Sequence, residues 1–75
     1  MPSKIKSGLA AHDAACALAY GVCQSAIAAA AGSQSAVLSA EVTYYRAVLA
    51  SALANGSSEA SYFSQTLRAL GTGGV

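Results

Sequence analysis

Apolar residues recur every three or four positions along most of this chain, which places them on one face of an α-helix. The first such stretch covers residues 8–31, with Ser7 before it as a capping residue and Gly32 after it as a terminator. Its repeating stripe consists of Leu9, Asp13, Cys16, Tyr20, Cys23, Ile27 and Ala30. Beside the stripe lie small residues that let a neighbouring helix come close, namely Ala15, Ala19, Val22 and Ala26.

A second stretch with the same spacing covers residues 36–54. Its stripe consists of Leu38, Val42, Tyr45, Leu49 and Ala52, widened by Val48 and Leu53. Ser33 and Ser35 precede it as capping residues, and the pair Asn55 and Gly56 follows it as a C-terminal cap. The spacing predicts a second long helix, whose stripe can face that of the first helix within one chain or between chains.

A third, shorter helix is predicted over residues 58–70. Ser57 or Ser58 caps its start, and Gly71 ends it. Its apolar edge consists of Phe63, Leu67 and Leu70. The sequence therefore predicts one all-α domain, a long helical hairpin plus a short third C-terminal helix. Residues 1–7 form a polar lead and residues 71–75 a glycine-rich tail, and we expect both to be flexible.

The composition predicts a small core. Of the 75 residues, 19 are Ala, 11 are Ser and 7 are Gly, whereas Leu, Ile, Val and Phe together number only 15. Alanine favours helices but contributes little burial energy. Charge is also scarce, with four basic and three acidic residues and a net charge of +1, and low charge promotes association. We therefore expect the isolated chain to be weakly folded or oligomeric at micromolar concentration.

Cys16 and Cys23 lie two turns apart on the first helix, about 10.5 Å along its axis, so they cannot bridge each other while it is intact. Two interpretations remain: reduced, buried cysteines that act as small hydrophobes, or cysteines that crosslink to another chain. His12 and Asp13 add two residue types that bind metals, but their spacing does not match that of structural zinc sites. We therefore predict no metal and no cofactor.

The residues also disfavour catalysis and nucleic-acid binding. No serine lies in a nucleophile-elbow motif, and Glu41 and Glu59 belong to different predicted helices, so paired acid–base chemistry has no support. The glycines of the tail precede no helix that would present amides to a phosphate. The basic residues are scattered, whereas nucleic-acid binding normally needs a basic cluster. We therefore expect no enzyme, no small-molecule substrate and no nucleic-acid partner.

Tyr44, Tyr45 and Arg46 form the most distinctive cluster. Adjacent helical positions diverge by about 100°, so we expect Tyr45 on the stripe of the second helix, and Tyr44 and Arg46 off it. Tyrosine and arginine are typical interface anchors. A second interpretation is equally supported, in which both tyrosines cover the core with their hydroxyls in water. The candidate interface residues are thus Tyr44, Tyr45, Arg46, Cys16 and Cys23.

A membrane role is the alternative to an assembly role. Residues 14–31 contain no charge and follow Lys4 and Lys6, as in a signal peptide, a pilin-like hairpin or a holin. Only Leu18, Val22 and Ile27 insert strongly into membranes, however, and the next helix is interrupted by charges.

Residues 40–52 (AEVTYYRAVLASA), Asn55 with Gly56, and residues 67–74 (LRALGTGG) resemble short alanine-rich proteins encoded in structural gene clusters of tailed bacteriophages. The resemblance covers residues 26–75 and carries over no site residues. It implies a virion role such as a capsid cement, head–tail connector or internal head protein. The leading hypothesis is therefore a virion structural protein that binds other copies and a larger capsid or neck protein. The alternative is a small membrane-associated protein of pilin or holin type.

Overall fold

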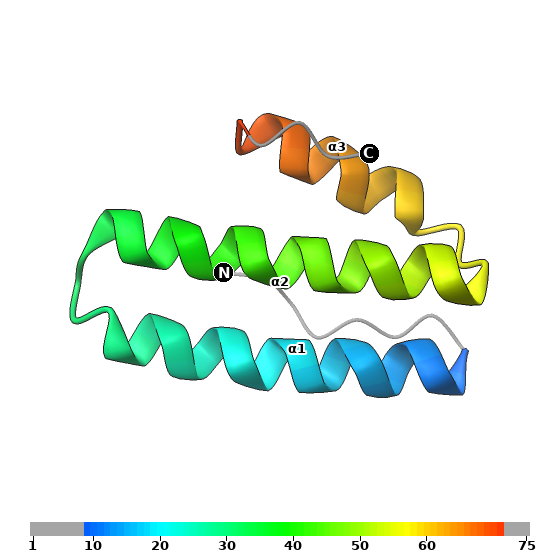
Figure 1. Cartoon of the computed structure of the whole chain (residues 1–75), viewed down its shortest axis with the longest axis horizontal. Coiled ribbons are helices and arrows are strands. Elements are labelled where there is room, and N and C mark those ends of the chain that lie inside the picture. The colour runs from blue at the N-terminus through cyan, green and yellow to red at the C-terminus, as the bar shows by residue number, and fades with distance from the viewer. Residues whose placement is uncertain (1–8, 72–75) are drawn as a thin grey trace.

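The computed structural model describes residues 9–71 and contains three helices in this range (Figure 1). They are α1 (Ala10–Ala29), α2 (Gln34–Asn55) and α3 (Ala60–Ala69). The helices α1 and α2 run antiparallel as a long hairpin, and α3 packs on α2. The predicted all-α architecture, a long hairpin with a short third helix at the C-terminal side, is confirmed.

Local sequence signals set most of the helix ends. The hydroxyl of Ser33 accepts a hydrogen bond from the Ala36 amide at 3.3 Å and so caps the start of α2. Gly56 adopts the left-handed conformation (φ 66°) that ends α2, and Gly71 does the same after α3 (φ 83°). Before α3, the Glu59 amide donates to the Ser57 hydroxyl at 3.2 Å. The predicted serine cap of the third helix is nevertheless wrong, because α3 begins at Ala60 with Glu59 at the N-cap position and no side chain caps it.

The first helix is shorter than predicted. It ends at Ala29, and the chain turns through Ala31 (φ 51°) and Gly32 (φ 85°), both in the left-handed region. The second helix begins two residues earlier than predicted because Ser33, not Ser35, is its cap. The predicted cap Ser7, the lead 1–7 and the tail 72–75 lie outside the described residues.

The core is small, as the composition predicts. Its nine buried apolar residues are Cys16, Cys23, Ala40, Tyr44, Val48, Leu49, Ala52, Phe63 and Leu67. Four of the nine are alanines or cysteines, so only five side chains supply most of the apolar burial. On α1, the partly buried Ala19, Tyr20 and Ile27 pack against this core.

The predicted stripe of α1 is partly wrong. Its buried residues are His12, Cys16 and Cys23, whereas the expected member Leu9 is exposed and Asp13 is only partly buried. A strict 4-3 spacing drifts relative to a straight helix with 3.6 residues per turn. The face of α1 that contacts α2 therefore includes His12 and not its neighbour Asp13, which the spacing predicted.

The expected position of Tyr44 is wrong as well. Tyr44 is only 2% exposed and packs against Tyr20 of α1, with ring centroids 6.4 Å apart. Tyr45 instead faces α3, where its ring lies 6.3 Å from that of Phe63. The reason is that α2 is the middle helix and buries two faces, one against each neighbour. The stripe read from the spacing is the face toward α3, and Tyr44 belongs to the face toward α1.

Candidate functional site

A fully buried histidine connects all three helices. His12 of α1 has no exposed surface. Its Nδ1 lies 2.8 Å from the hydroxyl of Ser51 on α2, and its Nε2 lies 3.0 Å from Oε1 of Glu59, which directly precedes α3. Because the backbones of α1 and α3 are not neighbours, these side chains supply the polar link between the two helices.

The hydrogen bonds define how the imidazole is protonated. An ionised carboxylate only accepts, so Nε2 carries a hydrogen and donates to Glu59. In the neutral ring Nδ1 then accepts from the Ser51 hydroxyl. If the ring gains a proton, Nδ1 donates to the same hydroxyl, since a hydroxyl can also accept. Both ring nitrogens are therefore satisfied in either state, and every buried side-chain nitrogen and oxygen in the described range has a partner.

The rest of the cluster is apolar. The sulfur of Cys16 lies 3.6 Å from Nε2 and 3.7 Å from Nδ1 of His12, one turn away on the same helix. The ring of Phe63 from α3 lies 6.3 Å from the imidazole. The spacing of residues could not predict this cluster, because Ser51 and Glu59 are 39 and 47 positions away from His12.

Ser51, His12 and Glu59 follow the order of nucleophile, base and acid in a catalytic triad. A nucleophile, however, needs access to a substrate and donors for the developing oxyanion. His12 is buried, and none of the three residues lines the groove between α1 and α2 or the smaller hollow between α2 and α3. The arrangement is suited to joining helices.

Both cysteines are free and buried. Burial raises the pKa of the Cys16 thiol, and the negative charges of Glu59 and Asp13 raise it further. Burial, with Glu41 as a second cause, likewise raises the pKa of Cys23. Because the thiolate is the reactive form, both groups are poor nucleophiles in the folded chain. The structure thus agrees with the interpretation of the cysteines as small hydrophobes.

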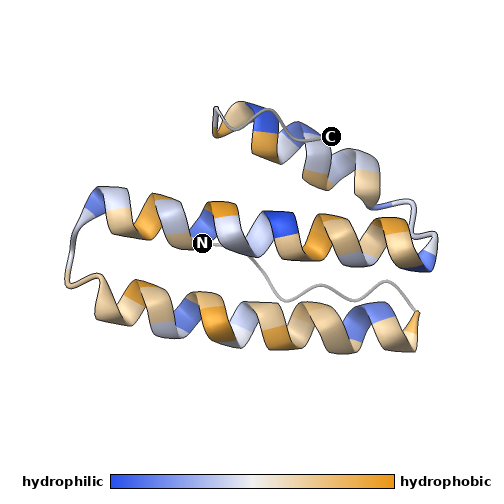
Figure 2. Cartoon of the chain, viewed as in Figure 1, coloured by the Kyte–Doolittle hydropathy of each residue, from blue (hydrophilic) through white to orange (hydrophobic). Residues whose placement is uncertain are grey.

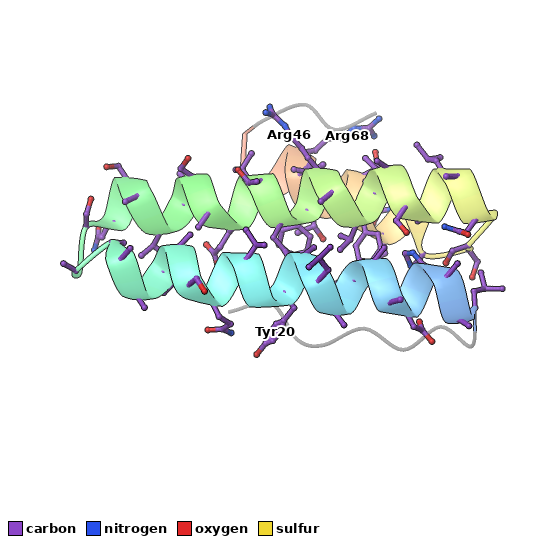
Figure 3. All side chains as sticks on the ribbon, turned by 60° about the horizontal axis from the view of Figure 1, so that its bottom comes forward. Tyr20, Arg46 and Arg68 are labelled. Atoms are coloured by element: carbon purple, nitrogen blue, oxygen red, sulfur yellow. The ribbon has the colours of Figure 1, made fainter. Side chains whose placement is uncertain are left out.

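The tyrosine and arginine candidates separate in space. Burial raises the pKa of Tyr44 to about 12, so its phenol stays neutral, and Tyr44 has almost no surface to offer a partner. Burial also raises the pKa of Tyr45, which is only partly covered. Arg46 is exposed and, with Arg68, projects beyond α2 on the edge of the molecule opposite Tyr20 (Figure 3). Only Tyr45 and Arg46 of the five candidates thus keep surface for a partner.

An apolar groove of about 680 Å³ runs between α1 and α2. Its α1 side is lined by Ala15, Leu18, Ala19, Val22, Cys23, Ala26, Ala29 and Ala30, and its α2 side by Ala36, Ser39, Ala40, Thr43, Tyr44 and Ala47. None of these residues is charged. We refer to this surface as the α1–α2 groove. Along it, α1 is coloured toward the hydrophobic end over almost its whole length, although only one side of it contacts α2 (Figure 2).

The groove lies on the side of α2 that faces away from α3. Positions two apart on a helix point roughly 200° away from each other. Thr43 and Ala47 line the groove, whereas Tyr45 and Leu49, two positions further along, face α3. On the α1 rim, Leu18 is 72% exposed and Val22 is 58% exposed. The sequence predicted only one part of this surface, the row of small residues beside the stripe of α1.

Two findings bear on the alternatives considered from the sequence. Within residues 9–71, no group of three or more His, Cys, Asp or Glu side chains is placed to hold a metal ion. None of the helices in the same range has the combination of length and hydropathy that a membrane span requires.

A comparison with known protein families, with curated proteins and with solved structures finds no match.

The His12 cluster makes a prediction for Ser51. Replacing Ser51 by Ala removes the hydroxyl partner of His12 Nδ1 and leaves only the weak contact with the Cys16 sulfur at 3.7 Å, which should lower the free energy of unfolding by about 1–3 kcal/mol. Ser25→Ala is the matched control, because it makes the same substitution at an exposed helical position of α1 outside the α1–α2 groove and has the same effect on helix propensity. Urea unfolding followed by circular dichroism measures both. Equal stability of the two variants would show that the hydrogen bond to Ser51 contributes nothing.

The buried thiols make a second prediction. In native protein at pH 8, Cys16 and Cys23 should react with a disulfide reagent only as fast as the chain opens, and in urea they should react at the rate of a free cysteine. A non-reducing gel of the native protein should show monomer only. A rapid native reaction, or a reducible ladder of crosslinked chains, would mean that the cysteines face outward.

Proposed function

We propose that this chain is a non-enzymatic assembly protein that binds a partner through the α1–α2 groove. The observation that carries the proposal is the groove itself, which is open, uncharged and flanked by the exposed side chains of Leu18 and Val22. Small monomeric proteins rarely leave a long contiguous apolar surface in water, and such surfaces typically mark sites of association. A partner that covers the groove would also add apolar burial to a chain whose own core is small.

The His12 cluster supports a structural role for the polar residues. It joins α1, α2 and the start of α3 through hydrogen bonds that are complete within the chain. Both ring nitrogens of the imidazole have partners in Ser51, Glu59 and Cys16, and neither the histidine nor any of these three residues lines the α1–α2 groove. The groove, in turn, contains no titratable group apart from the buried Cys23 and Tyr44, whose pKa values are raised.

The setting of the assembly is proposed from the sequence. The resemblance of residues 26–75 to alanine-rich proteins of tailed bacteriophages supports a place in the virion, as a capsid cement, head–tail connector or internal head protein. The scarcity of charge supports a role in which the chain is surrounded by protein. In this proposal its partners are further copies of itself and a larger capsid or neck protein.

The test is incorporation into phage particles. Particles are purified from a host that expresses the full chain, and the chain is quantified by mass spectrometry in the particles and in the host fractions. The native chain should be found in particles at a stoichiometric level. Leu18→Glu, which places a charge on the groove, should be lost from particles, whereas Leu38→Glu should be retained because Leu38 is exposed but does not line the groove.

Circular dichroism of both variants shows whether the helices are intact, and we expect them to be, since both side chains are exposed in the folded chain. The proposal is wrong if the native chain is absent from particles and is recovered only from the host, including the detergent extract of its membranes. Equal incorporation of the two variants would show that the chain enters particles without using the α1–α2 groove.

A further inference from the structure

We infer that the occupant of the α1–α2 groove is a second copy of this chain, related to the first by a two-fold axis parallel to the helices. The inference rests on the proposed function for the use of the groove as a docking surface, and it names the partner. Such an axis places α1 of each copy over α2 of the other. The product is a two-layer bundle in which the two hairpins face each other and each α3 lies on the outside.

The two rims of the groove have complementary shapes. The α1 rim is a ridge formed by Leu18 and Val22, which are one helical turn apart. The α2 rim is a shallow row of small or short side chains, namely Ala36, Ser39, Thr43 and Ala47. A two-fold operation brings the ridge of each copy onto the row of the other copy. The same contact therefore forms twice in the dimer. Each copy therefore supplies both the protruding side chains of the ridge and the row of short side chains that receives them.

The contacts within one chain set the register of this pairing. His12 meets Ser51 and Tyr20 meets Tyr44, so residues of α1 and α2 at the same height have numbers that add up to about 63 or 64. An axis parallel to the helices preserves height. Leu18 of one copy therefore meets the other copy between Thr43 and Ala47, and Val22 meets it between Ser39 and Thr43. All three of these α2 residues are exposed in the single chain.

The area is sufficient for a dimer. The helix α1 has 20 residues and is therefore about 30 Å long, and two helices side by side are about 20 Å wide. The face thus offers about 600 Å² in each copy. Two such faces bury more than the roughly 1,000 Å² in total that a specific interface needs. A small ligand would fill only part of a groove of this length.

The charge distribution also fits a second copy. None of the groove residues is charged, so two copies of this face meet without repulsion and without desolvating an ion. Arg46 of α2 and Arg68 of α3 project on the edge of the molecule opposite Tyr20 and do not line the groove (Figure 3). A partner with a charged surface would find no counter-charge in the groove, whereas the neutral groove of another copy needs none.

Sedimentation equilibrium of the full chain from 1 to 200 µM tests the inference. We expect a species of about twice the monomer mass of 7.4 kDa. Leu18→Glu on the ridge and Thr43→Glu on the opposite row should each be monomeric over this range, because each places a charge in the interface. Leu38→Glu, an exposed leucine outside the groove, should dimerise like the native chain. Circular dichroism checks that each variant is helical.

Crosslinking tests the register. Leu18→Cys and Thr43→Cys chains are mixed in equal amounts and oxidised, and a disulfide-linked heterodimer should form in high yield. Leu18→Cys mixed with Leu38→Cys should give little. Should both ridge and row variants unfold, this crosslink, made with uncharged substitutions, still decides the pairing. A native chain that is monomeric at 200 µM, a dimer that survives both charged variants, or equal yields from the two mixtures would overturn the inference.

The outcomes separate the inference from the proposed function. A chain that enters particles through the groove but is monomeric in solution and does not crosslink from position 18 to 43 has another occupant there, and only the inference fails. A chain that dimerises in this register but is absent from particles is a self-associating protein with another role, and only the virion proposal fails.

Discussion

The arrangement of the three helices depends on the burial of one polar ring. Alanine-rich faces look alike at every turn, so the packing of α1 on α2 by small residues does little to select one register over the next. His12 does select one. Its two nitrogens must both find partners in the interior, and they find them on Ser51 of α2 and on Glu59 at the start of α3. A shift of α2 or of the start of α3 by one residue would break one of these two hydrogen bonds, at a cost of about 1–3 kcal/mol. With only five large apolar side chains buried among residues 9–71, that is a substantial share of the stability.

The open groove follows from the same arrangement. Because α3 is held on one side of the hairpin by Glu59, Phe63 and Leu67, it leaves the other side of α1 and α2 uncovered. Eight alanines are among the residues that line this side, and none of its lining residues is charged. Among the α1 residues that line the groove, Leu18 and Val22 are the large aliphatic ones. The few large apolar side chains of this chain are therefore divided between its own core and the surface through which we propose that it associates.

The sequence predicted what local interactions determine. The number and order of the helices follow from the spacing of apolar residues, and the ends at Ser33, Gly56 and Gly71 follow from capping and from left-handed glycines. The sequence failed where a face is chosen by neighbours that are distant along the chain. Tyr44 is buried because α2 has a helix on each side, and a single 4-3 stripe describes only one contact. The cluster of His12, Ser51 and Glu59 could not be derived from spacing, although a histidine one turn before Cys16, on the same face, was a usable signal. The α1–α2 groove was visible only as the small flank of residues 15–26.

The most direct test of this account is a double-mutant cycle between His12 and Glu59. The free energy of unfolding is measured for the native chain, for His12→Leu, for Glu59→Ala and for the double variant, so that effects of each change on helix propensity and packing cancel. If the imidazole holds α3 through the carboxylate, the coupling free energy should be at least about 1 kcal/mol. Two effects that add to within about 0.5 kcal/mol would contradict the account and would mean that apolar contacts alone place α3.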